Sequence, residues 1–222
     1  MALHDVTMEI FEGEILGIIG PNGAGKTTLI NVITGVHLPT QGSLLLGGAD
    51  MTLLPAHERC RLGVARTFQL TKPLEDLSPL ENIRLGALFG QRLRKRDAEK
   101  RAEEICELVG LADVRRPLAR LSVLDVKKME IARALASKPR LLFLDEAMAG
   151  LNSNETLEII RLVRKIRDQG ITIGIVEHVM GVIRELSHRV VVLNFGQLLA
   201  VGPYEEVANN RQVIEAYLGE ET

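Results

Sequence analysis

The residues with the clearest chemical potential form a short glycine-rich stretch, GPNGAGKTT, at positions 20–28. The stretch fits the spacing G-x-x-x-x-G-K-[ST], which is typical of loops that bind phosphate groups. Its three glycines would let backbone N–H groups surround phosphate oxygens, Lys26 would reach the β- and γ-phosphates, and Thr27 would offer its hydroxyl to Mg²⁺. An ordinary glycine turn with an exposed lysine is the alternative, but a chance match in one chain is on the order of one percent.

Two adjacent carboxylates follow an apolar run, RLLFLDE, at positions 140–146. Open α/β sheets bind ligands at the carboxyl ends of their strands, so Asp145 and Glu146 would lie at the edge that holds the phosphate loop. Asp145 could hold Mg²⁺ through water, and Glu146 could polarise an attacking water. Acidic pairs at strand ends often serve only as caps, and the nearby phosphate loop favours the catalytic interpretation.

Three further polar residues gain meaning only from their order along the chain. His178 closes another apolar run at the same expected edge, Gln69 ends the stretch RTFQ, and Ser122 begins LSVLDVKKMEIARAL. A single histidine is usually structural, and nothing in the sequence gives a role to the others, which are His4, His37, His57 and His188.

The elements that must position these residues alternate between strands and helices. Short apolar runs with flanking glycines predict strands, and amphipathic spacing predicts helices. We predict strands at 14–20, 42–51, 63–70, 140–146 and 171–178, helices at 27–35 and 154–170, and a hairpin at 188–202 that turns at 194–196. This order predicts an α/β fold with a mostly parallel sheet and helices on both faces. The charged helical composition of residues 78–136 indicates an inserted helical subdomain.

Composition limits the classes of partner. The chain has 222 residues, a net charge of −2 and only 3% aromatic residues without tryptophan. This balance disfavours nucleic acid as a partner, because it provides neither a broad positive field nor an aromatic platform. Residues 91–110 are basic first and acidic later, which indicates a solvated helix face; a nucleic-acid patch there is the minor alternative.

The cysteines and the hydropathy point to an intracellular protein without its own membrane span. Cys60 and Cys106 form no pattern, and although His57 and Cys60 share a helical spacing, no second ligand pair follows. Buried, inert thiols are therefore expected rather than a metal site. No apolar run approaches the ~20 residues needed to span a bilayer, and the N-terminus has no signal-peptide pattern. Any link to a membrane must come through a partner.

In the order of its motifs the chain resembles the ATP-binding cassette family of nucleotide-binding domains, from about residue 3 to residue 220. Its phosphate loop, Gln69 (glutamine loop), Ala149–Asn152 (inter-subunit turn) and His178 (switch histidine) match motifs of that family. The resemblance implies ATP and Mg²⁺ as ligands and a P-loop (RecA-like) fold. It assigns ATP binding to Gly20, Pro21, Asn22, Gly23, Ala24, Gly25, Lys26, Thr27, Thr28 and Ser122, Mg²⁺ binding to Thr27, Gln69 and Asp145, and catalysis to Glu146 and His178.

A narrower likeness connects the chain to the ATPase subunits of branched-chain amino-acid importers, through GVARTFQL, AGLN and VIEAYLGE (213–220). It implies one ATP-binding domain over 1–222, with a core of about 1–69 and 137–222 and a helical subdomain of about 70–136. It also implies a head-to-tail homo- or heterodimer at the cytoplasmic face of the membrane. The partners would be permease subunits, docked near Gln69 and the helical insert, and, indirectly, an extracytoplasmic amino-acid-binding protein.

The chain departs from the family pattern at three places. Val123, Leu124 and Asp125 stand where the family has two small residues and a glutamine, and Ala147 stands where it has proline. The family's adenine-stacking aromatic lies upstream of the phosphate loop, so we expect the matching segment to precede Met1, with Phe11 as a substitute to consider. Ser122 and Asp125 still form an S-x-x-D capping arrangement, which would keep the helix start.

An active ATPase is the favoured interpretation, because the chain keeps all five polar residues that hydrolysis would use, which are Lys26, Gln69, Asp145, Glu146 and His178. One alternative is a nucleotide-sensing subunit with little hydrolysis, since the LSVLD stretch departs from the family pattern. Another is a soluble cassette protein of translation or DNA repair, although such proteins usually carry two cassettes or a long coiled-coil insert, which this chain lacks.

Overall fold

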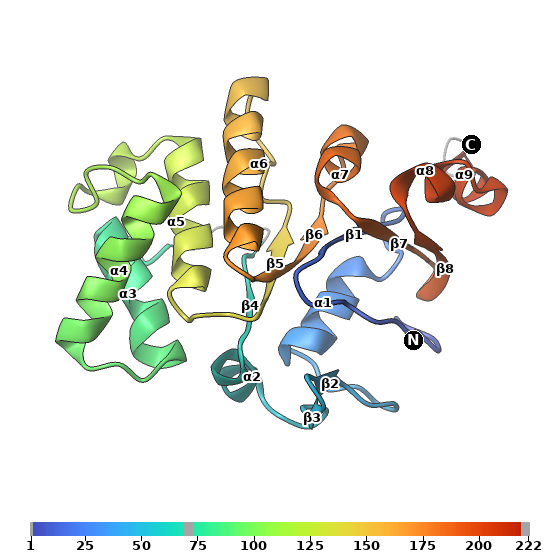
Figure 1. Cartoon of the computed structure of the whole chain (residues 1–222), viewed down its shortest axis with the longest axis horizontal. Helices are drawn as coiled ribbons and strands as arrows, with labels where there is room; N and C mark the ends of the chain where they lie inside the picture. The colour runs from blue at the N-terminus through green and yellow to red at the C-terminus, as the bar shows by residue number, and fades with distance from the viewer. Residues whose placement is uncertain (1, 69–72, 219–222) are drawn as a thin grey trace.

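The main sheet of the protein has six strands in the order β4-β5-β6-β1-β7-β8 (Figure 1). The computed structural model describes residues 2–68 and 73–218. All neighbouring strands are parallel except β7 and β8, which form an antiparallel hairpin. The mostly parallel α/β fold is therefore confirmed. The strands are β1 (Ile15–Ile19), β4 (Val64–Arg66), β5 (Leu141–Asp145), β6 (Thr172–Val176), β7 (Arg189–Asn194) and β8 (Gln197–Gly202).

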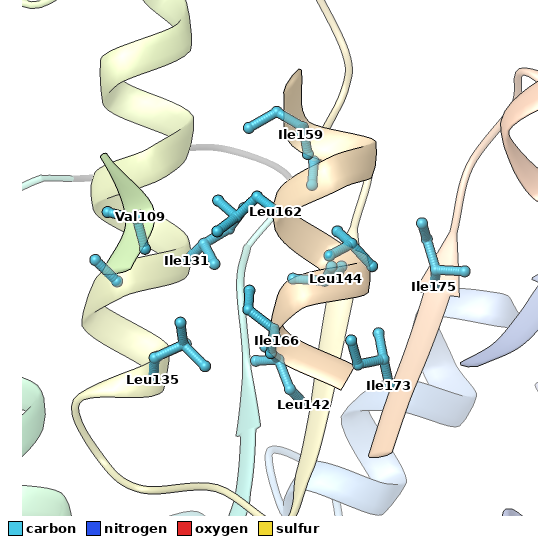
Figure 2. Close-up of a cluster of buried hydrophobic side chains, with 14 of the residues drawn as sticks. Val109, Ile131, Leu135, Leu142, Leu144, Ile159, Leu162, Ile166, Ile173 and Ile175 are labelled. Atoms are coloured by element: carbon cyan, nitrogen blue, oxygen red, sulfur yellow. The ribbon is translucent and has the colours of Figure 1, made fainter. Parts of the chain in front are cut away.

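Side chains alternate between the two faces of this sheet, because successive residues of a strand point in opposite directions. In β5, Leu142 and Leu144 face the larger core cluster, whereas Leu141 and Phe143 face the smaller one. Helices cover both faces: α1 (Lys26–Thr34) belongs to the smaller cluster, and α5 (Val123–Leu135), α6 (Ser153–Asp168) and α7 (Met180–Leu186) to the larger one. Figure 2 shows isoleucines and leucines of α5 and α6 meeting those of β5 and β6. Burial on both faces explains why the strands are continuous apolar runs.

Helices α3 (Pro79–Gly90), α4 (Lys95–Val109) and α5 pack against one another beside β4, at one end of the molecule (Figure 1). Ser78 begins α3 with a capping box that it shares with Glu81. A short 3₁₀ helix, Leu118–Arg120, precedes α5. The expected helical insert is present, whereas its limits at about 70 and 136 stay a prediction.

Several elements differ from the sequence-based expectation. Residues 42–51 form a hairpin of two short strands, β2 (Leu45–Leu46) and β3 (Ala49–Asp50), rather than one strand. Gly47 and Gly48 have φ angles of 56° and 82°, so the chain reverses between them. Four short helices were not predicted from the sequence, which are α2 (Ala56–Leu62), α7, α8 (Tyr204–Ala208) and α9 (Arg211–Leu218).

The two cysteines are both free thiols, Cys106 buried and Cys60 partly buried. Burial, the largest effect, raises the pKa of the Cys106 thiol to about 11, which makes it unreactive at neutral pH. His57 and Cys60 are not part of a larger cluster, because no group of three or more histidine, cysteine or acidic side chains that could hold a metal ion gathers within residues 2–68 and 73–218. In the same described ranges, no helix combines the length and the apolar character that a membrane crossing requires.

Arg59 of α2 is the buried polar centre that fixes the C-terminal end of α1. Its guanidinium is fully buried and donates to the carbonyl oxygens of Val32 and Ile33 in the last turn of α1. It also donates to Leu54 O and Thr52 O, each at 2.8 Å. One side chain thus satisfies carbonyls of α1 and of the loop before α2, which holds the helix that follows the glycine-rich stretch in place.

We predict that Arg59→Met lowers the free energy of unfolding by about 3 kcal/mol, because several buried carbonyls would lose their donor. Chemical denaturation followed by circular dichroism measures this change. Arg61→Met is the matched control, since Arg61 lies on the same helix and is exposed, and it should change stability by less than about 0.5 kcal/mol. Equal effects of the two substitutions would contradict the role given to Arg59.

Candidate functional site

The glycine-rich stretch lies where β1 ends and α1 begins, as its sequence predicted. Gly20, Gly23 and Gly25 have φ angles of 148°, 76° and 104°, which side-chain-bearing residues rarely adopt. A Cβ on Gly20 would lie 2.1 Å from the carbonyl oxygen of Leu193, so this position requires glycine. The loop therefore opens directly onto the N-terminus of a helix, which is a favourable place for an anion.

Lys26 lies across this loop. It is buried, and its Nζ donates to the carbonyl oxygens of Gly20 at 2.6 Å and Pro21 at 2.8 Å. Thr27, in the first turn of α1, is exposed. The loop borders a pocket of about 240 Å³, which is lined by Ala2, Asn22, Gly23, Ala24, Gly25, Lys26, Thr27, Thr28, Glu146, Val176 and His178. The structure thus brings the glycine-rich loop, Glu146 and His178 to one place.

Asp145 ends β5 and is 2% exposed; it is not among the described residues that line the pocket, although the next residue, Glu146, is. Its Oδ2 is 2.8 Å from Nη2 of Arg66. Burial raises the pKa of the Asp145 carboxyl; Arg66 opposes this rise, and Glu146 adds to it. Arg66 also donates to Asn31 Oδ1 of α1 at 2.5 Å, and its guanidinium carbon lies 4.7 Å from the ring centre of Phe68. Arg66 was not predicted to have a role, although it stands three residues before Gln69.

The oxygen donors here fit Mg²⁺. A threonine hydroxyl and an aspartate carboxylate beside a phosphate-binding loop are the hard ligands that this ion prefers, together with phosphate oxygens and water. Thr27 and Asp145 supply these donors. The third expected ligand, Gln69, lies outside the described residues.

Glu146 has an unusual backbone conformation, with φ at 52°. Three contacts hold it there: its N–H donates to Val176 O at 2.9 Å, its carbonyl accepts from Lys127 Nζ at 3.1 Å, and its Oε1 lies 2.8 Å from His178 Nε2. Strain of this kind persists where the surroundings over-determine a conformation, and it is common at active sites. Lys127, a buried residue of α5, thus connects that helix to Glu146, which the sequence did not indicate.

Glu177 is a second buried carboxylate near Glu146. Its Oε1 accepts the N–H of Met148 at 2.9 Å, which ties the end of β6 to the turn that contains Ala149–Asn152. Burial raises the pKa of the Glu177 carboxyl; the Met148 hydrogen bond lowers it, and Glu146 raises it further. The sequence holds one signal for Glu177: it is a carboxylate at the end of an apolar run, directly before His178.

Ser122 begins α5 as expected. Its Oγ accepts the N–H of Asp125 at 3.1 Å, and the Asp125 carboxylate accepts the N–H of Ser122, which confirms the capping box. The Asp125 charge is not isolated, because Arg116 Nη2 lies 2.6 Å from its Oδ2. Leu124 is partly buried against the core, whereas Val123 is 53% exposed. The departures from the family pattern at positions 123–125 are therefore accommodated locally.

Ser122 is exposed and, in the described part of the chain, is not among the residues that line the pocket. Its helix, α5, stands apart from α1 in Figure 1, on the other side of β4 and β5. The structure of one chain thus brings most of the expected site together and leaves Ser122 outside it.

We predict that Glu177→Gln flattens the pH dependence of stability. Because the folded-state pKa is raised above the ordinary value of 4.5, the wild-type carboxyl stabilises the fold fully below about pH 4.5 and loses this contribution as pH rises through the raised pKa. Glutamine cannot ionise, and its oxygen can still accept the Met148 N–H. The variant should therefore gain stability relative to wild type between about pH 5 and 8.

Thermal melts across this range measure the effect, with the exposed Glu12→Gln as the control. A loss of stability that is the same at every pH would contradict the prediction.

Comparison with protein families gives two matches. Residues 3–149 match the model described as ABC transporter. Residues 197–222 match the model described as branched-chain amino acid ATP-binding cassette transporter.

Individual relatives agree with these matches. The high-affinity branched-chain amino acid transport ATP-binding protein LivG of Escherichia coli (strain K12) is 37% identical, over 99% of this chain and 92% of that protein. The BraF protein of Pseudomonas aeruginosa, which carries the same description, is 36% identical over the same shares. The lipopolysaccharide export system ATP-binding protein LptB of Acidithiobacillus ferridurans is 33% identical over 100% of this chain and 92% of that protein.

Solved structures show the same fold. A nucleotide-free ATP-binding cassette from an ABC transporter has a TM-score of 0.88 at 29% identity and covers 97% of this chain and 92% of its own. A dimeric cassette, MJ0796 bound to ADP and Pi, has a TM-score of 0.82 at 28% identity, over 91% and 90% of the two chains. The fold is therefore that of P-loop nucleotide-binding proteins, and the chain belongs to the ABC transporter family of ATP-binding proteins.

Proposed function

We propose that this protein is the ATP-hydrolysing subunit of an importer for branched-chain or related amino acids. The observation that carries the proposal is the contact between Glu146 Oε1 and His178 Nε2, 2.8 Å apart, in the pocket that the glycine-rich loop borders. A strained carboxylate held by a histidine beside a phosphate-binding loop suits the activation of a water molecule. Membership in the ABC transporter family identifies the nucleotide as ATP.

Each residue of the pocket has a distinct role in this proposal. The backbone N–H groups of residues 22–28 and the Lys26 ammonium bind the β- and γ-phosphates. Thr27, Asp145 and Gln69 would hold Mg²⁺, which would supply positive charge beside the phosphates. Glu146 accepts a proton from the attacking water. His178 fixes the Glu146 carboxylate through its Nε2, and Lys127 fixes the Glu146 backbone.

The position of Ser122 supports a dimer. The pocket of about 240 Å³ is smaller than the roughly 300–1,000 Å³ of ordinary small-molecule sites, and the capped, exposed start of α5 lies outside it. In a head-to-tail dimer, homo- or heteromeric, the Ser122 hydroxyl and the N-terminal amides of α5 would complete the partner's site. The paired charge of Asp125 leaves this helix start able to receive a phosphate, which argues against the nucleotide-sensing alternative.

The importer assignment rests on the relatives. The curated proteins of highest identity named above are described by branched-chain amino acid transport, and the C-terminal family match has the same description. The chain would act at the cytoplasmic face of the membrane, on permease subunits that receive their cargo from an extracytoplasmic binding protein. The similarity to LptB, whose description is lipopolysaccharide export, gives the second candidate, an exporter subunit.

Purification of the native complex distinguishes the importer subunit from the exporter subunit. We expect the chain to co-purify with permease subunits whose reconstituted ATPase activity is stimulated by an amino-acid-loaded binding protein. Stimulation by lipopolysaccharide instead would favour the exporter.

We predict that Glu146→Gln leaves ATP binding intact, lowers turnover 10²–10⁴-fold and traps an ATP-bound dimer, because general-base catalysis has this typical magnitude. A steady-state ATPase assay and gel filtration with ATP measure both effects. Glu12→Gln serves as the control of unchanged activity. Wild-type turnover in Glu146→Gln would remove Glu146 from its assigned role.

We predict that Ser122→Ala lowers hydrolysis at least tenfold while ATP binding to the monomer stays near wild type, because the helix start acts only in the closed dimer. Ser78→Ala is a matched control, since Ser78 begins α3 with the same type of capping box. Loss of either cap should cost about 1 kcal/mol of stability, so only Ser122→Ala should impair hydrolysis. Similar hydrolysis by both folded variants would contradict the composite site.

A further inference from the structure

The turn between β7 and β8 carries a residue that its geometry does not favour. Asn194 pairs with Gln197, so the loop consists of Phe195 and Gly196, with φ angles of 46° and 77°. A two-residue hairpin loop with positive φ at both positions favours asparagine, aspartate or glycine. Gly196 fits this turn, whereas a bulky side chain at the first position is strained.

Burial does not compensate for this strain. Phe195 is 87% exposed, the largest exposed fraction among the large hydrophobic residues in the described part of the chain. Its ring therefore gains little from the core, and the turn would be more stable with asparagine. Where local geometry and residue type disagree in this way, a binding role is a physical reason for the residue.

The turn lies against the glycine-rich loop. The N–H of Gly196 donates to Ala24 O at 2.9 Å, and Gly196 O accepts the N–H of His4 at 2.7 Å. A Cβ on Gly25 would lie 3.5 Å from Gly196 Cα. Ala2, whose carbonyl oxygen would be 2.6 Å from a Cβ on Gly196, lines the same pocket as residues 22–28. The turn thus packs against the glycine-rich loop and against the N-terminal segment that borders the pocket.

The sheet order places this turn on the side toward which a nucleobase would extend. Glu146 follows β5 and His178 follows β6, and both strands lie on one side of β1, whereas β7 and β8 lie on the other. If the γ-phosphate points toward Glu146, the remainder of the nucleotide leaves the loop away from it, toward the turn. An exposed aromatic ring there offers a flat face to the base.

We propose that the Phe195 ring stacks on the nucleobase of ATP. This proposal deepens the proposed function and rests on it, but it uses a residue outside every motif that carried the family resemblance. Aromatic stacking tolerates different bases, because every base presents a π-face. Phe11 does not share this position: it precedes β1, at the end opposite the glycine-rich loop, and its ring lies 4.4 Å from the Arg189 guanidinium carbon.

Titration calorimetry with ATP and with inorganic tripolyphosphate tests the proposal. Phe195→Ala should weaken ATP binding about tenfold and leave tripolyphosphate binding unchanged, since tripolyphosphate has no base. Phe195→Tyr should retain ATP affinity. Phe195→Asn should raise the melting temperature, because asparagine suits the turn, and yet weaken ATP binding like alanine. Phe11→Ala is the control: Phe11 is half-exposed, and its substitution should leave ATP affinity unchanged.

Unchanged ATP affinity in Phe195→Ala would overturn the proposal, as would an equal loss of ATP and tripolyphosphate affinity, which would indicate a displaced loop. Unchanged affinity together with loss of the dimer or of permease binding would assign Phe195 to a protein contact instead. Failure of the wild-type chain to bind ATP would overturn the proposed function itself.

Discussion

Three carboxylates, Asp145, Glu146 and Glu177, lie at the carboxyl ends of β5 and β6. Their negative charge is the constraint on which the arrangement of the rest of the site depends. Burial raises the pKa values of the Asp145 and Glu177 carboxyls, and the charge of Glu146 raises both further. Three neighbouring side chains offset this negative charge. Arg66 of β4 pairs with Asp145, Lys127 of α5 reaches the Glu146 carbonyl, and His178 contacts the Glu146 carboxylate.

The side chains that offset the negative charge also connect α1 and α5 to the ends of β5 and β6. Arg66 joins Asp145 to Asn31 of α1, so the helix that begins at Lys26 and the acidic strand end share one side chain. Lys127 connects the helix that begins near Ser122 to the backbone of the proposed catalytic base. A shift of α5 on closure of a dimer would therefore move the Glu146 backbone through Lys127. Removing a partner from such a buried network costs more than removing the pair, because a charge is left without compensation.

The sequence predicted those features that depend on local pattern. The glycine spacing located the loop of residues 20–28, the apolar runs located the parallel strands, and S-x-x-D located the capping box of Ser122. Arg66, Lys127 and Glu177 escaped prediction because their contacts join residues 79, 19 and 29 positions apart. The same limit applies to Arg116, whose ion pair with Asp125 explains how a carboxylate is tolerated near the start of α5. The turn at 194–196 was predicted, but the conflict between Phe195 and its backbone conformation is visible only in the structure.

The central claim is that two chains build each hydrolytic site, one with its glycine-rich loop and Glu146 and the other with Ser122. Mixing Glu146→Gln with Ser122→Ala and measuring steady-state ATP hydrolysis tests this claim most directly. In a mixed head-to-tail dimer one site carries both substitutions and the other carries neither. The account predicts that the mixture regains activity well above the sum of the two variants measured separately. Activity equal to that sum would contradict a site shared between two copies of this chain.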